Sequence, residues 1–207
     1  MFEKHDVLPL SLYEFEIPAA LYVKTLKQCE DINWNEVPKR SNKPEQGRST
    51  SDFHRDEECQ DLKNFIEQCL EEVRVDIKAH TIEKIAVSQL WANKSVKDEW
   101  HWGHTHNWSF LTGIIYIKGV TGNTWFSRQS DYDKLISYSI RQSEEGENLL
   151  IHKQAPKLGS MFIFPSNLFH SVDEVKESER ITISFNSFPT GTLGNWENLG
   201  SVKLNVE

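Results

Sequence analysis

From residue 82 onward the sequence alternates short apolar segments with turns, and this pattern constrains the fold more than any other feature. The segments are rich in β-branched and aromatic residues and are separated by Gly, Pro, Asn or charged residues, as expected of short strands. They cover residues 83–93, 109–119, 123–129, 147–154, 160–166, 168–175 and 180–188. A set of strands of this length and spacing predicts a β-sandwich or jelly roll.

Two helices are predicted ahead of the strands. Apolar residues recur with helical spacing after Pro18, and a clearer apolar stripe runs from Leu62 to Ile77. The polar segments 35–52 and 130–148 are predicted to be loops. We therefore predict an α+β fold, in which a double-stranded β-helix core (a cupin-like jelly roll) carries flanking N-terminal helices.

Length and charge limit the domain organisation and the partners. A chain of 207 residues with 38% hydrophobic residues is expected to form a single domain over 1–207. Its predicted parts are an N-terminal strand and helices over 7–80, the jelly-roll core over 82–190 and a C-terminal tail over 191–207. The net charge of -8 and the absence of a basic block disfavour non-specific nucleic-acid binding.

Cysteine usage and hydropathy predict a cytoplasmic protein. The three cysteines are an odd number, and Cys59 and Cys69 lie too far apart along one predicted helix to form a disulfide. The N-terminus lacks the features of a signal peptide, and no apolar run approaches the roughly 20 residues that span a bilayer. We expect no membrane association, and pairing of the N-terminal strand with the C-terminal tail across a homodimer stays open.

A cluster of histidines marks the first candidate site. On a strand, side chains two residues apart share a face, so His104 and His106 are predicted to converge while His101 points away. Two imidazoles suit Zn, Cu or Fe, but they need at least one further ligand to hold such a metal. Without that ligand, the pair would be a surface or interface feature.

Two later segments supply candidates for the missing groups. Segment 162–170 is an apolar strand followed by a Pro-Ser turn and His170, which a neighbouring strand could bring beside the first pair. In segment 179–186, Arg180 and Thr182 share one face of a strand that is apolar on its other face. In an open sheet that face would meet water, whereas inside a barrel Arg180 must find an anion such as a carboxylate.

Together, the segments HTHNWSFLTGIIYI, KLGSMFIFPSNLFHSV and ERITISFN resemble the iron- and 2-oxoglutarate-dependent oxygenase superfamily, in particular its bacterial and phage group. The resemblance covers about residues 82–188. It implies a double-stranded β-helix fold with Fe(II) and 2-oxoglutarate as cofactors. It also implies oxidation of a substrate, most often hydroxylation, with release of succinate and CO2.

The resemblance assigns roles to five residues. His104, His106 and His170 would be the catalytic metal ligands, and Arg180 would bind the distal carboxylate of 2-oxoglutarate with support from Thr182. Most of the superfamily has a carboxylate where this chain has His106. A neutral imidazole in that place leaves the metal more cationic.

Other residues have secondary roles in this interpretation. Tyr116 shares strand parity with the histidine pair if the strand is unbroken, so it is a candidate second donor to 2-oxoglutarate. Candidate substrate contacts, each also explicable by packing, are His101, Trp108, Trp91 and Asn93. Three carboxylates near the motifs, Asp98, Glu99 and Asp173, are either hydrogen-bond partners of the ligands or solvated loop charges.

Two other functions remain open at this stage. The same histidines suit a three-His, cupin-like dioxygenase or zinc site that does not use 2-oxoglutarate, or a jelly-roll binding module without turnover. The sequence leaves the substrate unspecified, as a small molecule or a peptide, and the loops 35–52 and 130–148 are expected to select it.

Overall fold

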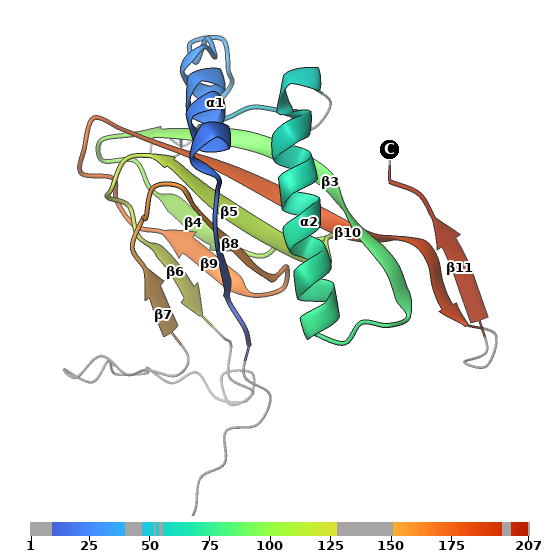
Figure 1. The fold of residues 1–207 in the computed structure, drawn as a ribbon. Helices are drawn as coiled ribbons and strands as arrows, with labels where there is room; N and C mark the ends of the chain where they lie inside the picture. The colour runs from blue at the N-terminus through green and yellow to red at the C-terminus, as the bar shows by residue number, and fades with distance from the viewer. Residues whose placement is uncertain are drawn as a thin grey trace, which may run out of the picture.

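The computed structural model contains two antiparallel sheets packed face to face, with two helices on the outer face of the larger sheet (Figure 1). It describes residues 10–39, 47–51, 53, 56–127, 151–195 and 200–206. The larger sheet has the strand order β1-β8-β5-β10-β3-β2, with β11 added to β10, and the smaller has the order β4-β9-β6-β7. The larger sheet comprises β1 (Tyr13–Glu16), β2 (Arg48–Ser49), β3 (Ile82–Val96), β5 (Leu111–Lys118), β8 (Ser160–Pro165), β10 (Glu179–Asn195) and β11 (Gly200–Leu204). The smaller sheet comprises β4 (His101–His104), β6 (Thr124–Ser127), β7 (Ile151–Gln154) and β9 (Phe169–Val172).

The helices form where the apolar stripes predict them. Helix α1 (Ala19–Glu30) follows Pro18, whose fixed φ suits a helix start. Helix α2 (Gln60–Asp76) continues a short 3-10 helix, Glu57–Cys59, in which the Asp56 side chain caps the backbone N–H of Glu58. The buried stripe of α2 consists of Leu62, Ile66, Cys69, Leu70 and Val73. Both predicted helices are therefore confirmed, and both bury one face against the sheet.

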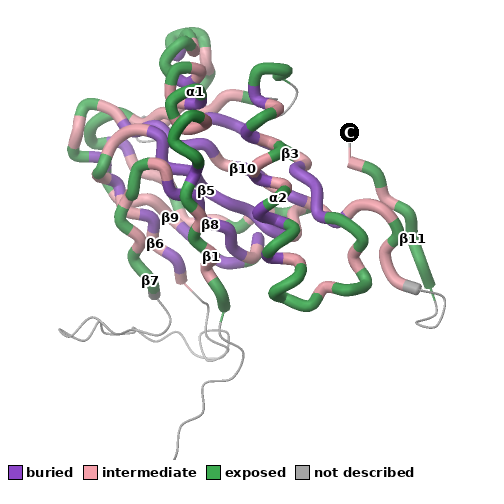
Figure 2. Tube along the Cα trace, in the orientation of Figure 1, coloured by how far each residue is buried: buried purple, intermediate pink, exposed green. Residues whose placement is uncertain are grey.

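The strands in the middle of the larger sheet are buried on both faces (Figure 2). On β5, Ile115 and Ile117 belong to the core under the helices, whereas Ile114 and Tyr116 belong to a second cluster that faces the smaller sheet. This arrangement explains why the sequence of β5 is nearly continuously apolar rather than alternating. The second cluster leaves room for a cavity between the sheets.

The predicted α+β fold with a double-stranded β-helix core is confirmed. The strands after residue 82 all form, and the predicted C-terminal tail contributes the end of β10 and the hairpin strand β11. The predicted loop 35–52 contains β2, which pairs with β3. The predicted loop 130–148 lies outside the described residues, as do 40–46 within the earlier loop. Among the described helices, none combines the length and the apolar character needed to cross a membrane.

Candidate active site

A cavity between the two sheets collects most of the predicted site residues. The empty space within it is about 580 Å³, a volume that includes open solvent at its mouth. The smaller sheet contributes His104 and His170 to its lining, and the larger sheet contributes Arg180 and Thr182. The predicted metal ligands and the predicted carboxylate-binding residues therefore line the same cavity from opposite sheets.

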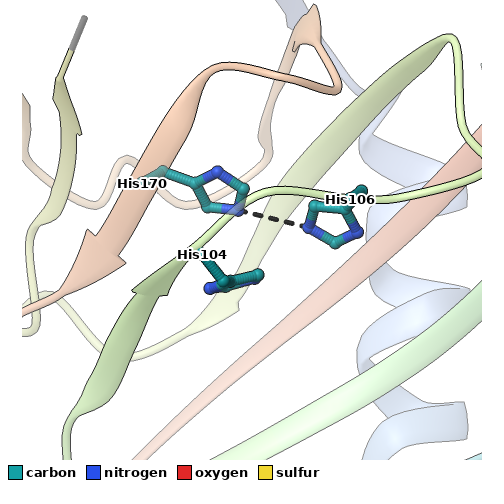
Figure 3. Close-up of side chains that lie close together, drawn as sticks. All are labelled: His104, His106 and His170. Carbon is teal, nitrogen blue, oxygen red and sulfur yellow. Dashed lines mark hydrogen bonds between the residues drawn. The ribbon is translucent and has the colours of Figure 1, made fainter. Parts of the chain in front are cut away.

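Three histidines converge on one side of this cavity (Figure 3). His104 ends β4 and pairs directly with His170 on β9, while His106 follows β4 and donates its backbone N–H to the carbonyl of Ser166. The three candidate ligand atoms all lie within 4.8 Å of one another, and Nε2 of His106 is 3.2 Å from Nε2 of His170. Two nitrogens bound to one metal by bonds of about 2.0–2.1 Å lie roughly 3 Å apart, which is close to the separation of His106 Nε2 and His170 Nε2.

Backbone carbonyls fix the orientation of two of these rings. Nδ1 of His104 lies 2.8 Å from the carbonyl oxygen of Trp102, and Nδ1 of His170 lies 2.9 Å from that of Leu168. A carbonyl oxygen only accepts, so Nδ1 carries the hydrogen and Nε2 keeps its lone pair for a metal. This second hydrogen bond is a regular feature of histidine metal ligands.

The position of His101 differs from the prediction. Strand parity predicted that His101 points away from His104, but the two rings lie with centroids 4.5 Å apart and both line the cavity. The cause is a register shift between β4 and β9, because three residues from His101 to His104 span only two from Val172 to His170. Such a bulge turns an odd-numbered step to the same face.

Arg180 lies opposite the histidines, on β10, and is fully buried against the cavity. Neither its Nε nor its Nη2 has a hydrogen-bond partner among the described residues. Burial lowers the pKa of Arg180, while Tyr116, Asp173 and Glu177 act in the opposite direction. An arginine remains protonated under these conditions, so the guanidinium is a buried positive charge that requires an anion.

Tyr116 and Thr182 lie close to this guanidinium. The ring of Tyr116 stands 5.6 Å from the Cζ of Arg180, and its hydroxyl hydrogen-bonds to Thr124 Oγ1 at 2.8 Å. Burial raises the pKa of Tyr116, so the phenol stays protonated. Tyr116 was selected on the condition that one unbroken strand joins it to the histidine pair, and this condition is wrong because β4 and β5 belong to different sheets. Tyr116 nevertheless lies next to Arg180.

The predicted substrate residues divide into two groups. Trp91 and Asn93 line the cavity as expected, and Asn93 donates to Ser184 Oγ and accepts from Ser49 Oγ. Trp108, by contrast, is 91% exposed and does not line the cavity.

Two of the carboxylates considered as hydrogen-bond partners of the histidines, Glu99 and Asp173, bind other groups. Glu99 accepts the backbone N–H of Val96 and pairs with Lys39, and Asp173 accepts hydrogen bonds from Asn123 and Trp125. Backbone carbonyls, and not these carboxylates, accept the hydrogen bonds from the histidine rings.

Several lining residues were missed from the sequence, among them Ser95, Thr112, Ile114, Thr124, Phe164 and Val172. Strand parity could have found four of these six. Ser95 alternates with Asn93 on β3, Thr112 and Ile114 alternate with Tyr116 on β5, and Val172 alternates with His170 on β9. The others depend on how the sheets pack.

Comparison with known families supports the interpretation of this site. Residues 89–186 match the model of a family described as "Putative 2OG-Fe(II) oxygenase". This segment is similar to the 2-oxoglutarate- and Fe(II)-dependent oxygenases. It contains the three histidines, Arg180 and Thr182. No curated protein sequence matches the chain significantly.

Solved structures share the fold of this chain at low sequence identity. A prolyl-4-hydroxylase from Pseudomonas putida is 13% identical with a TM-score of 0.62, covering 88% of this chain and 94% of that one. HygX from Streptomyces hygroscopicus, solved with nickel and 2-oxoglutarate, is 11% identical with a TM-score of 0.59, covering 88% and 84%. The α-ketoglutarate-dependent epimerase SnoN from nogalamycin biosynthesis is 9% identical with a TM-score of 0.67, covering 90% and 80%.

The residues of the cavity fit the cofactors of the family that segment 89–186 matches. Three imidazole nitrogens converge where a transition metal would lie, and imidazole is a suitable donor for iron. The buried guanidinium of Arg180 has the charge and planar shape that match a carboxylate. The predicted use of Fe(II) and 2-oxoglutarate is thus supported by the family and by the donors present.

Proposed function

We propose that His104, His106 and His170 hold Fe(II) and that Arg180 anchors the distal carboxylate of 2-oxoglutarate in this oxygenase. The observation that carries the proposal is the buried guanidinium of Arg180, whose Nε and Nη2 have no hydrogen-bond partner among the described residues and which lines the same cavity as the converging histidines. A purely structural arginine would be paired, because a buried charge without a partner is costly. An anionic cosubstrate provides the missing partner.

In this proposal each residue has a defined task. Bound iron and 2-oxoglutarate supply the oxidising chemistry, which couples release of succinate and CO2 to hydroxylation of a substrate. Arg180 offers two parallel N–H donors to the carboxylate, and the Thr182 hydroxyl, which is buried beside it, adds a third. Tyr116 packs against the guanidinium and limits its movement. The chain thereby orients the cosubstrate and excludes water around it.

We further propose that the substrate is a small molecule or a peptide that enters near His101, Trp91 and Asn93. These residues line the cavity with the histidines, and His101 holds its ring through a 3.0 Å contact between Nδ1 and the Trp102 carbonyl. Trp108 is a weaker candidate because it lies outside the lining. The polar side chains of Asn93 and His101 favour recognition of the substrate by hydrogen bonds.

The setting of the protein is also a proposal. We infer that it functions in the reducing cytoplasm, because Cys29, Cys59 and Cys69 are buried free thiols. We propose a single oxygenase-like domain over 1–207, in which β1 is a strand of the sheet that carries Arg180 and α1 packs on that sheet. A homodimer stays a prediction.

Turnover of 2-oxoglutarate tests the proposed function. Purified protein loaded anaerobically with Fe(II) is mixed with 2-oxoglutarate and oxygen, with and without candidate substrates, and succinate is quantified. We expect succinate above the metal-free control. Metal-dependent activity that neither binds nor consumes 2-oxoglutarate would instead favour the three-His dioxygenase or zinc site. Protein that binds no metal would favour a binding module.

A further inference from the structure

A turn that lies outside the cavity packs directly behind Arg180. It connects β5 to β6 and contains Gly119 and Gly122, whose φ angles are +91° and +77°. A Cβ added at Gly119 would lie 3.0 Å from the Cα of Arg180, and one added at Gly122 would lie 3.0 Å from its Cδ and 3.2 Å from its Nε. Glycine thus lets the backbone touch both the main chain and the stem of the arginine.

Two carboxylates hold this turn in place. Oε1 of Glu177 accepts hydrogen bonds from the backbone N–H groups of Val120 and Thr121 and from the Thr121 hydroxyl, at 2.7, 2.8 and 2.9 Å. Asp173 accepts from the side chain of Asn123 at 2.9 Å. Hydrogen bonds to a charged acceptor are among the stronger ones in proteins, so the turn cannot easily retreat from β10.

The other neighbours of Arg180 are equally fixed. The ring of Tyr116 is 5.6 Å from the guanidinium carbon and is held by Thr124. Val175, which is fully buried, would lie 3.1 Å from a Cβ at Gly122. A methyl group at Gly122 must therefore displace the arginine stem. Because Arg180 lines the cavity and Gly122 does not, the displacement moves the guanidinium toward the cavity.

We propose that Gly122 is a positioning residue that sets the depth of the Arg180 guanidinium, and through it the length of the 2-oxo dicarboxylate that fits between arginine and metal. This inference rests on the proposed function. It assigns a role in cosubstrate selection to a residue that contacts neither the metal nor the cavity. The turn, held by its hydrogen bonds to Glu177 and Asp173, prevents the Arg180 side chain from moving away from the cavity.

The test compares Gly122→Ala with Gly159→Ala. Gly159 also has a positive φ, +81°, but a Cβ there would meet nothing closer than Tyr22 at 3.8 Å, so it reproduces the backbone strain without crowding Arg180. Dissociation constants for 2-oxoglutarate and for oxaloacetate, which is one methylene shorter, are measured anaerobically on Fe(II)-loaded protein. Fe(II) affinity is measured in parallel.

We expect Gly122→Ala to weaken 2-oxoglutarate binding about tenfold, because small misplacements of a binding group carry costs of this order. Oxaloacetate binding should weaken less, so the preference for the longer acid falls, while Fe(II) affinity stays unchanged. Gly159→Ala should keep the wild-type preference. An unchanged preference in folded Gly122→Ala would overturn the inference, and so would an equal change in Gly159→Ala.

A second variant covers the case in which Gly122→Ala does not fold. Thr121→Val keeps the side-chain shape but removes the hydroxyl that donates to Glu177 and accepts the backbone N–H of Lys176, which loosens the turn without changing any charge. We expect about threefold weaker 2-oxoglutarate binding, on the scale of one hydrogen bond. An unchanged dissociation constant would contradict the inference. Wild-type protein that binds no 2-oxoglutarate would instead refute the proposed function itself.

Discussion

The two walls of the cavity differ in how completely the protein satisfies its own polar groups. On the smaller sheet, His104 and His170 are already oriented by backbone carbonyls. On the larger sheet, Arg180 is buried with Nε and Nη2 unpartnered among the described residues. The chain itself orients the rings on one wall, whereas two guanidinium nitrogens on the other wall have no hydrogen-bond partner in the described part of the chain. We infer that the histidine wall is preformed for the proposed metal and that the arginine wall is where the proposed cosubstrate would bind.

The largest effect is expected on the histidine wall. His170→Ala removes one of three converging imidazoles, so Fe(II) affinity should fall by more than about 100-fold, beyond the range for losing an outer partner of a ligand. Succinate formation should fall to background. Metal titration and a succinate assay measure both. His152→Ala, an exposed histidine on β7 of the same sheet, is the matched control and should bind Fe(II) normally. Retained Fe(II) affinity in His170→Ala would remove the proposed metal site.

Arg180→Met tests whether cosubstrate binding on the arginine wall is independent of metal binding on the histidine wall. It keeps an unbranched side chain but removes the charge, so 2-oxoglutarate binding should weaken by about 100-fold or more, as expected when one partner of a buried charge pair is lost. Fe(II) affinity should stay within about threefold of wild type, because the histidines are oriented locally. Calorimetric titration measures both constants. Arg74→Met, which removes a partly buried arginine that pairs with Glu71 and does not line the cavity, is the control. Parallel losses of metal and cosubstrate would show that the walls are not independent.

Thr182→Val tests the arginine wall at the level of one hydroxyl. The residue is buried, lines the cavity and is proposed to support the same carboxylate. Loss of one hydrogen bond should weaken 2-oxoglutarate binding by about 3–10-fold. Thr190→Val makes the same change on the same strand, where the hydroxyl bonds to the Leu204 carbonyl away from the cavity. Equal dissociation constants for the two variants would exclude Thr182 from cosubstrate binding.

The last prediction concerns the core behind the larger sheet, where no effect is expected at neutral pH. Burial raises the pKa of the Cys29, Cys59 and Cys69 thiols to about 12. Each thiol thus keeps in the folded state a proton that it loses in the unfolded state above about pH 9. Folding stability should be undiminished by these groups below pH 9 and should decline as the pH rises toward 12. Denaturant unfolding at several pH values tests this, and iodoacetamide labelling at pH 8 should require unfolding. Rapid labelling of native protein at pH 8 would contradict the burial of these thiols.

Sequence patterns predicted the fold well because its signals are local. The apolar stripe of α2 and the alternation around Arg180 each require only one element to be assigned correctly. The family match over 89–186 bears out the motif recognition that joined them.

The rest depended on register and packing, which single segments do not encode. The side chain of His101 was predicted to point away from His104, but a bulge between β4 and β9 turns it to the same face. No residue type in the sequence indicates this bulge. Tyr116 reaches the arginine from a different sheet than the parity argument assumed. Thr124 lines the cavity because the smaller sheet folds over β5, a tertiary contact.

An anaerobic titration of the Fe(II) protein with 2-oxoglutarate tests most directly whether both walls serve one bound cosubstrate. Chelation of iron by the 2-oxo acid produces a visible metal-to-ligand charge-transfer band. We predict that the band appears and saturates in wild-type protein, and that Arg180→Met requires about 100-fold more 2-oxoglutarate to develop it. Fe(II)-loaded wild-type protein that shows no band at any 2-oxoglutarate concentration would contradict the proposal.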